Sequence, residues 1–368
     1  MKIEAIGIIG SNPTAGGLAE IAASKGIQVR IYDILKDNLS STLARIHWSL
    51  AKENKQDLLK NIEPVQELAM LSGADLVMEV GGAVSEDKAQ LFTKLSEAVS
   101  PECIIALNCG VEPITPLSHN ISNPARIAGF NFCAPVKANR LVEIVRTNET
   151  SDSVLEFCAE FARELGKTPV IAHDNPGVIV ERIRRPFILS AMKLMELGKG
   201  FPHEIDSAVK SIGGFPMGPF EMADAIGLDR DFKASEIIYK LLGKSDRLKP
   251  SPIENRLVQY GQFGKKSTVG FYLYEDGEIV GVNPTLQEIA HYLGISTVSQ
   301  EKIFMPILSQ VANEAKTLAA EAVISEFDIE TAVKLALGWP KGPFTLAREM
   351  SLHLYSPKAE SDQWGDAL

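Results

Sequence analysis

The first residues that could do chemistry form a short loop near the N-terminus. Gly10, Asn12 and Ala15 occupy the three key positions of a G-x-G-x-x-G spacing, between the strand expected over 3–10 and a helical pattern over 16–25. In that spacing the middle glycine lets the backbone approach a pyrophosphate, and the helix N-terminus binds its charge. Only the first glycine is present, so the loop predicts a nucleotide site with altered phosphate contacts.

The histidines and cysteines show no spacing typical of a metal site or a redox pair. The histidines are His47, His119, His173, His203, His291 and His353, and the cysteines are Cys103, Cys109, Cys133 and Cys158. Without a histidine motif beside it, Cys109 is better interpreted as a packed thiol than as a nucleophile. No signal-peptide pattern precedes the first strand, so we expect a cytoplasmic protein without a metal.

Alternating strand and helix patterns position the N-terminal loop. A second strand over 27–33 ends on the acidic residue Asp33, which completes the β-α-β opening typical of a doubly wound nucleotide-binding domain. Further apolar runs continue the alternation at 74–80, 103–107, 126–132 and 142–146. The sequence predicts an α/β, Rossmann-like N-terminal domain.

The pattern changes after Asn175-Pro176-Gly177, where helical periodicity replaces strands. The segment 214–220, GFPMGPF, returns 124 residues later as GWPKGPF at 338–344. Upstream, Glu204-Ile205-Asp206 returns as Asp328-Ile329-Glu330 at the same displacement. We predict an NAD-binding domain over 1–177 and two related all-α domains over 178–282 and 283–368.

Composition excludes two classes of partner. The chain is 45% hydrophobic and carries a formal charge of -10, with basic residues only in short clusters. No apolar run approaches the roughly 18 residues that a transmembrane helix needs. We therefore expect neither nucleic acid nor a membrane as a partner.

Six ordered blocks link the chain to a known family. They are ADLVME at 74–79, LVEIVR at 141–146, GKTPV at 166–170, NPG at 175–177, FPMGPF at 215–220 and GQFGKK at 261–266. With these blocks the sequence resembles the 3-hydroxyacyl-CoA dehydrogenases, and its second helical copy is similar to the arrangement in multifunctional fatty-acid oxidation proteins. The resemblance implies NAD as cofactor, an acyl-CoA ligand, and a monomer or homodimer.

The resemblance assigns cofactor roles to the loop and to two charged residues. Asp33 stands where the family binds the adenosine ribose, and Lys88 stands at a cofactor-side lysine. Both favour NAD binding, whereas Asn12 and Pro13 disfavour it, because a side chain and a proline stand where the pyrophosphate would lie.

The resemblance also shows altered catalytic positions. Asn131 replaces the family's histidine base, Gly110 its serine and Glu181 its asparagine, while the glutamate that orients the histidine is kept as Glu143. An amide cannot act as a general base near neutral pH.

Three functions follow as alternatives. One is NAD-dependent oxidation of a 3-hydroxyacyl-CoA at a reduced rate or on an altered substrate. Another is a catalytically silent acyl-CoA-binding or NAD-binding protein of the same fold. The third is a different reaction, with Glu181 as a substitute base and Asn131 polarising an oxygen.

Overall fold

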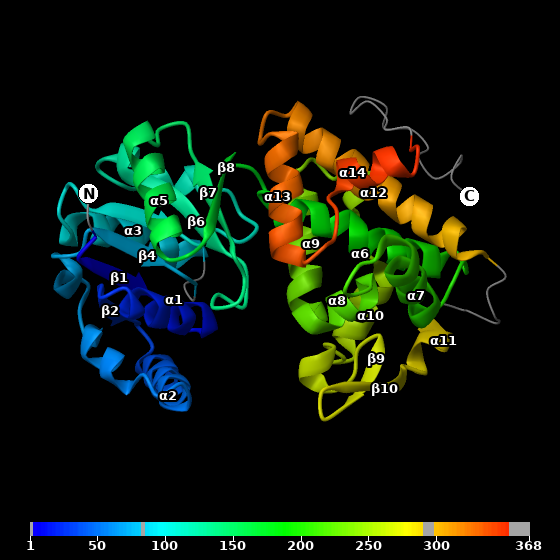
Figure 1. Ribbon diagram of the computed structural model, residues 1–368, viewed down its shortest axis with the longest axis horizontal. Coiled ribbons are helices and arrows are strands. Elements are labelled where there is room, and N and C mark those ends of the chain that lie inside the picture. The colour runs from blue at the N-terminus through cyan, green and yellow to red at the C-terminus, as the bar shows by residue number, and fades with distance from the viewer. Residues whose placement is uncertain (1–2, 82–84, 290–297, 353–368) are drawn as a thin grey trace. The chain divides into compact units, whose positions relative to one another are not determined.

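The first part of the chain folds around one mainly parallel sheet. The computed structural model describes residues 3–81, 85–289 and 298–352, and the chain divides into two compact units, Met1–Val178 and Ile179–Leu368. In the first unit, eight strands lie in the order β3-β2-β1-β4-β5-β6-β7-β8, and only β6 and β7 pair antiparallel (Figure 1). The strands are β1 (Ala5–Ile9), β2 (Gln28–Tyr32), β3 (Ile62–Val65), β4 (Leu76–Glu79), β5 (Ile104–Leu107), β6 (Ile127–Phe132), β7 (Leu141–Arg146) and β8 (Thr168–His173).

Burial follows from the strand sequences. Every residue of β4, β5 and β6 is buried, as expected of central strands covered by helices on both faces. The helices of this unit are α1 (Pro13–Ser24), α2 (Lys36–Lys52), α3 (Ser85–Ala98), α4 (Thr115–Ser118) and α5 (Asp152–Glu164). The strand order from β3 to β6 is that of a doubly wound nucleotide-binding sheet, so the predicted Rossmann-like class is confirmed.

The two edge strands of the sheet have sequence patterns that only weakly indicate a strand. Strand β3 contains Pro64 and lies at the edge of the sheet, where a missing N–H is tolerated. Strand β8, at the other edge, begins Thr168-Pro169 and exposes alternate residues.

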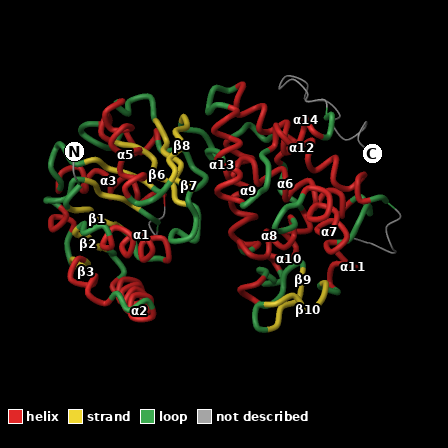
Figure 2. Tube along the Cα trace, viewed as in Figure 1, coloured by secondary structure: helices red, strands yellow, loops and turns green. Residues whose placement is uncertain are grey.

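The second unit is mainly helical, as predicted (Figure 2). Its helices are α6 (Val180–Glu196), α7 (Pro202–Gly213), α8 (Pro219–Ile226), α9 (Leu228–Leu241), α10 (Pro252–Gln259), α11 (Thr285–Ile289), α12 (Gln300–Ala320), α13 (Glu326–Leu337) and α14 (Pro343–Glu349). Helix α12 packs against both α6 and α7. The division of this unit into two domains at residue 283 stays a prediction.

One β-hairpin interrupts the region that we expected to be all helical. Strands β9 (Tyr272–Glu275) and β10 (Glu278–Val282) pair antiparallel around Asp276-Gly277. Both turn residues have positive φ, 50° and 83°, which suits the Asp-Gly pair of a tight hairpin turn. The expectation of an all-α region is therefore corrected by this hairpin, for which Asp276-Gly277 was the signal in the sequence.

The repeated segments adopt the same local structure and face each other. Helices α7 and α13 both end at a left-handed glycine, Gly214 and Gly338, with φ of 66° and 67°. The Cβ of a residue at 214 would lie 3.6 Å from Pro340, and at 338 it would lie 3.5 Å from Pro216. Such reciprocal contacts are the mark of a two-fold arrangement.

Candidate functional site

The N-terminal loop is closed by contacts with the neighbouring strand. Gly10 has φ of 97°, and a Cβ there would lie 2.2 Å from the carbonyl oxygen of Gly81, so this position requires glycine. Asn12 caps α1, accepting from the Ala15 N–H at 3.0 Å, and donates through Nδ2 to the Val80 carbonyl at 2.8 Å. The side chain of Asn12 therefore fixes the loop and occupies one N–H of the helix terminus.

Asp33 and Lys88 each already have protein partners. The Asp33 carboxylate accepts the hydroxyl of Ser11 on one oxygen and the Leu35 N–H, at 2.8 Å, on the other. Lys88 Nζ lies 3.4 Å from Glu79 Oε2, and Glu79 is buried. Burial raises the pKa of Glu79, and the charge of Lys88 partly opposes that rise.

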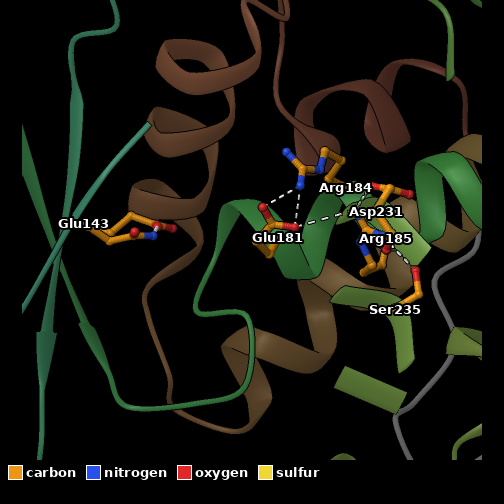
Figure 3. Close-up of polar contacts among 7 residues, drawn as sticks. Glu143, Glu181, Arg184, Arg185, Asp231 and Ser235 are labelled. Carbon is orange, nitrogen blue, oxygen red and sulfur yellow. Dashed lines mark hydrogen bonds and ion pairs between the residues drawn. The ribbon is translucent and has the colours of Figure 1, made fainter. Parts of the chain in front are cut away.

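Asn131 and Glu143 form a buried polar contact between two neighbouring strands. They are register partners on β6 and β7, and Asn131 Nδ2 donates to Glu143 Oε2 at 2.5 Å. The side chains are 9% and 1% exposed, respectively. The structure thus brings together the residue at the base position and the carboxylate expected to orient it (Figure 3, where Glu143 is labelled).

The segment after β5 packs beside this pair. Asn108 Oδ1 accepts the Phe132 N–H at 3.0 Å. Gly110 has φ of 59°, and apart from its chain neighbours no atom of the described residues lies within 4 Å of the position of a Cβ. Cys109 is buried against Gly129, and burial, together with the charge of Glu143, raises the pKa of its thiol. Cys109 is therefore a protonated, packed thiol.

Asp174 fixes the far end of this segment and was missed in the sequence. Its carboxylate accepts the N–H groups of Ile114 and Thr115, at 3.0 and 2.8 Å, and the Thr115 hydroxyl at 2.6 Å. Its place directly before Asn175-Pro176-Gly177 was the available signal.

Glu181 lies in the second unit, in the first turn of α6. Both of its carboxylate oxygens accept from Arg184 Nη2, and Oε2 also lies 3.5 Å from Arg185 Nη2 (Figure 3). Arg185 in turn pairs with the buried Asp231 and donates to Ser235 Oγ at 2.7 Å. Glu181 therefore begins a chain of charge pairs that runs into the core of this unit.

Comparison with known proteins decides the family. The model of the 3-hydroxyacyl-CoA dehydrogenase NAD-binding domain matches residues 5–175, and that of the C-terminal domain matches residues 177–274. The 3-hydroxyadipyl-CoA dehydrogenase of Escherichia coli K12 is 32% identical over 92% of this chain and 70% of its own length. The chain belongs to the 3-hydroxyacyl-CoA dehydrogenase family.

A solved structure and a further relative support this assignment. The crystal structure of 3-hydroxybutyryl-CoA dehydrogenase from Escherichia coli K12 has a TM-score of 0.85 at 28% identity, covering 95% of this chain and 92% of that one. A probable 3-hydroxybutyryl-CoA dehydrogenase of Deinococcus radiodurans is 35% identical, over 73% of this chain and 99% of its own length. The family resemblance inferred from the six sequence blocks is therefore confirmed.

The described part of the chain contains neither a cluster of metal ligands nor a membrane-spanning helix. Residues 3–81, 85–289 and 298–352 contain no cluster of three or more metal-ligating side chains. His291 and His353 lie outside the described residues. Within the described residues, no helix is both long and apolar enough to cross a bilayer.

Proposed function

We propose that this member of the family binds a 3-hydroxyacyl-CoA-type thioester without oxidising it by the histidine-dependent route. The observation that carries the proposal is the hydrogen bond from Asn131 to Glu143. In the family, a base at this position takes the hydroxyl proton. An amide bonded to a buried carboxylate orients a ligand oxygen but takes no proton.

The missing base has a large kinetic consequence. A positioned general base typically contributes about 10²- to 10⁴-fold in rate. Gly110 also offers no hydroxyl where the family has a serine. A ligand-binding protein with little or no dehydrogenase turnover is the function that these two positions favour.

The phosphate loop supports the same proposal. Pro13 has no N–H at the first position of α1, and Asn12 already occupies the Ala15 N–H. Two of the donors that a helix terminus offers to a pyrophosphate are therefore absent or used. The loop therefore does not fit the pyrophosphate of NAD.

Restoring the family residues tests the proposal. We expect no NADH absorbance when the purified protein is mixed with NAD and 3-hydroxybutyryl-CoA. Calorimetry should still detect the thioester. The combined variant Gly110→Ser, Asn131→His and Asn12→Gly should gain turnover. Efficient turnover by the unaltered protein would overturn the proposal.

A second candidate is a slow NAD-dependent dehydrogenase that uses Glu181 as its base. A first-turn carboxylate at the position of the family's asparagine favours it. The ion pair with Arg184 opposes it, because the guanidinium already occupies both carboxylate oxygens. Under this candidate Glu181→Gln abolishes a measurable activity; unchanged activity excludes it.

We also propose that the chain is a monomer, in which the second helical copy replaces a partner subunit. Glu314 on α12 bridges Arg182 on α6 and Arg247, each at 2.6 Å. Reciprocal contacts between the repeated segments support the same arrangement. Sedimentation equilibrium should give the mass of one chain, and an obligate dimer would contradict it. No disulfide joins the four cysteines, all of which lie in the described residues, and this suits a reducing, cytoplasmic location.

A further inference from the structure

The orientation of the Asn131 amide is fixed by its partner. A carboxylate only accepts hydrogen bonds, so the half of the amide that faces Glu143 must be the NH₂ group. The carbonyl oxygen of the same amide accepts no hydrogen bond from the described residues. Asn131 is slightly more accessible than the fully buried Glu143. A ligand that reaches this position therefore meets an acceptor oxygen and the second N–H of the amide.

These two groups suit a hydroxyl better than a ketone. A hydroxyl can donate to the Asn131 carbonyl oxygen and accept from the remaining N–H. A ketone can only accept, so at best it uses the N–H and leaves the carbonyl oxygen without a partner. The nearby Glu143 carboxylate also disfavours an electron-rich ketone oxygen.

We infer that this site selects 3-hydroxyacyl over 3-oxoacyl thioesters, with Asn131 as the specificity-determining residue and Glu143 as its positioning residue. The inference rests on the proposed binding function. It adds that the protein distinguishes the two oxidation states of its ligand. One additional neutral hydrogen bond corresponds to an affinity ratio of about 2- to 10-fold.

The test compares the affinities of two thioesters in the absence of NAD. Isothermal titration calorimetry with 3-hydroxybutyryl-CoA and acetoacetyl-CoA should give a lower Kd for the hydroxy form, by about 2- to 10-fold. Equal affinities, or tighter binding of acetoacetyl-CoA, would overturn the inference and leave the proposed function intact. Binding of neither thioester would overturn the proposed function as well.

The variant Glu143→Gln isolates the positioning role. A glutamine can turn either its NH₂ group or its oxygen toward Asn131, so the amide of Asn131 is free to rotate. The ratio of the two Kd values should fall toward one while binding of the CoA thioesters persists. A merely structural role for Glu143 would weaken both ligands equally, and an unchanged ratio would refute the assignment.

Two further variants protect the test from a folding defect. Asn131→Ala removes both hydrogen-bonding groups and should give the same ratio near one. Glu20→Gln is the matched control, because Glu20 on α1 is a buried carboxylate of the same unit that pairs with Lys137 and Ser49 and not with Asn131. It should keep the ratio of the unaltered protein. Loss of the ratio in Glu20→Gln would attribute the effect to general destabilisation.

Discussion

The two helical copies share one local motif but differ in how deeply it is embedded. In each copy a helix ends at a left-handed glycine, and an acidic side chain from that helix accepts the first N–H groups of the next helix. Asp206 accepts the N–H groups of Phe220 and Glu221, both at 3.0 Å. In the other copy, Glu330 accepts the N–H groups of Gly342, Phe344 and Thr345, at 3.1, 2.8 and 3.0 Å.

The difference lies in what surrounds each acid. Asp206 is 1% exposed and also accepts the hydroxyl of Tyr272, from the β9–β10 hairpin, at 2.8 Å. Glu330 is only partly buried, and its additional partner is the hydroxyl of Thr345, on the helix α14 that it caps, at 2.9 Å. The comparison teaches that both copies keep an acidic side chain that caps the start of the next helix. The hairpin surrounds this acid with a buried core in the first copy alone.

The largest expected effect tests whether the two copies depend on each other. Phe215 and Trp339 are repeat equivalents whose rings lie 4.5 Å apart, and both are buried. Replacing either with alanine should lower the free energy of unfolding by about 3–5 kcal/mol, measured by urea denaturation. Phe327→Ala, at a ring that is 77% exposed, is the control and should cost less than about 0.5 kcal/mol. A large loss of unfolding free energy in only one of the two variants would show that Phe215 and Trp339 are not equivalent in the core.

The two acids should differ in their cost of removal. Asp206→Ala leaves the N–H groups of Phe220 and Glu221 and the buried hydroxyl of Tyr272 without their acceptor, which should cost about 2–4 kcal/mol. Glu330→Ala removes a cap from a partly exposed helix start, which should cost about 1–2 kcal/mol. Urea midpoints of the two variants measure the difference. Equal losses of unfolding free energy would show that the hairpin does not strengthen the cap formed by Asp206.

The glycines opposite the acids give a smaller version of the same contrast. A Cβ at 218 would lie 2.2 Å from Asp206 Cγ, and at 342 it would lie 2.5 Å from Glu330 Cδ. Gly218→Ala should cost about 1–3 kcal/mol, because the short, buried Asp206 cannot move aside. Gly342→Ala should cost less, since the longer Glu330 can yield toward solvent. The reverse order in thermal denaturation would contradict this reading.

The last expected effect, small over any one pH unit, is a pH dependence that arises in the first copy. Burial raises the pKa of Asp206 to about 7 from an ordinary value of 3.8. The folded state therefore holds a proton that the unfolded state has lost, so the stability from this group is complete below about pH 4 and falls as pH rises through 7. The slope for one group is at most about 1.4 kcal/mol per pH unit.

Urea midpoints at pH 5, 6, 7 and 8 measure that slope. Asp206→Asn should remove part of the decline seen in the unaltered protein. Glu330→Gln should leave the decline as it is. An identical pH profile for Asp206→Asn and the unaltered chain would place the titration elsewhere.

Much of the architecture was readable from the sequence because it depends on local patterns. The β-α-β opening and the 124-residue repeat were predicted from apolar spacing and turn residues, and the structure contains both. The edge strands β3 and β8 were harder to predict because proline interrupts their pattern. The β9–β10 hairpin had a usable signal in Asp276-Gly277.

The sequence by itself determined which chemistry is missing, since residue type alone says that Asn131 is no base, Gly110 has no hydroxyl and Pro13 has no N–H. Only the tertiary structure decided how the remaining groups are used. Glu143 fixes the orientation of the Asn131 amide, and the Asn12 side chain forms hydrogen bonds with Ala15 and Val80. Glu181 forms an ion pair with Arg184 on the same helix. The physical reason is that each polar group can form only a few hydrogen bonds. Which groups it bonds depends on how distant segments of the chain pair in the folded sheet.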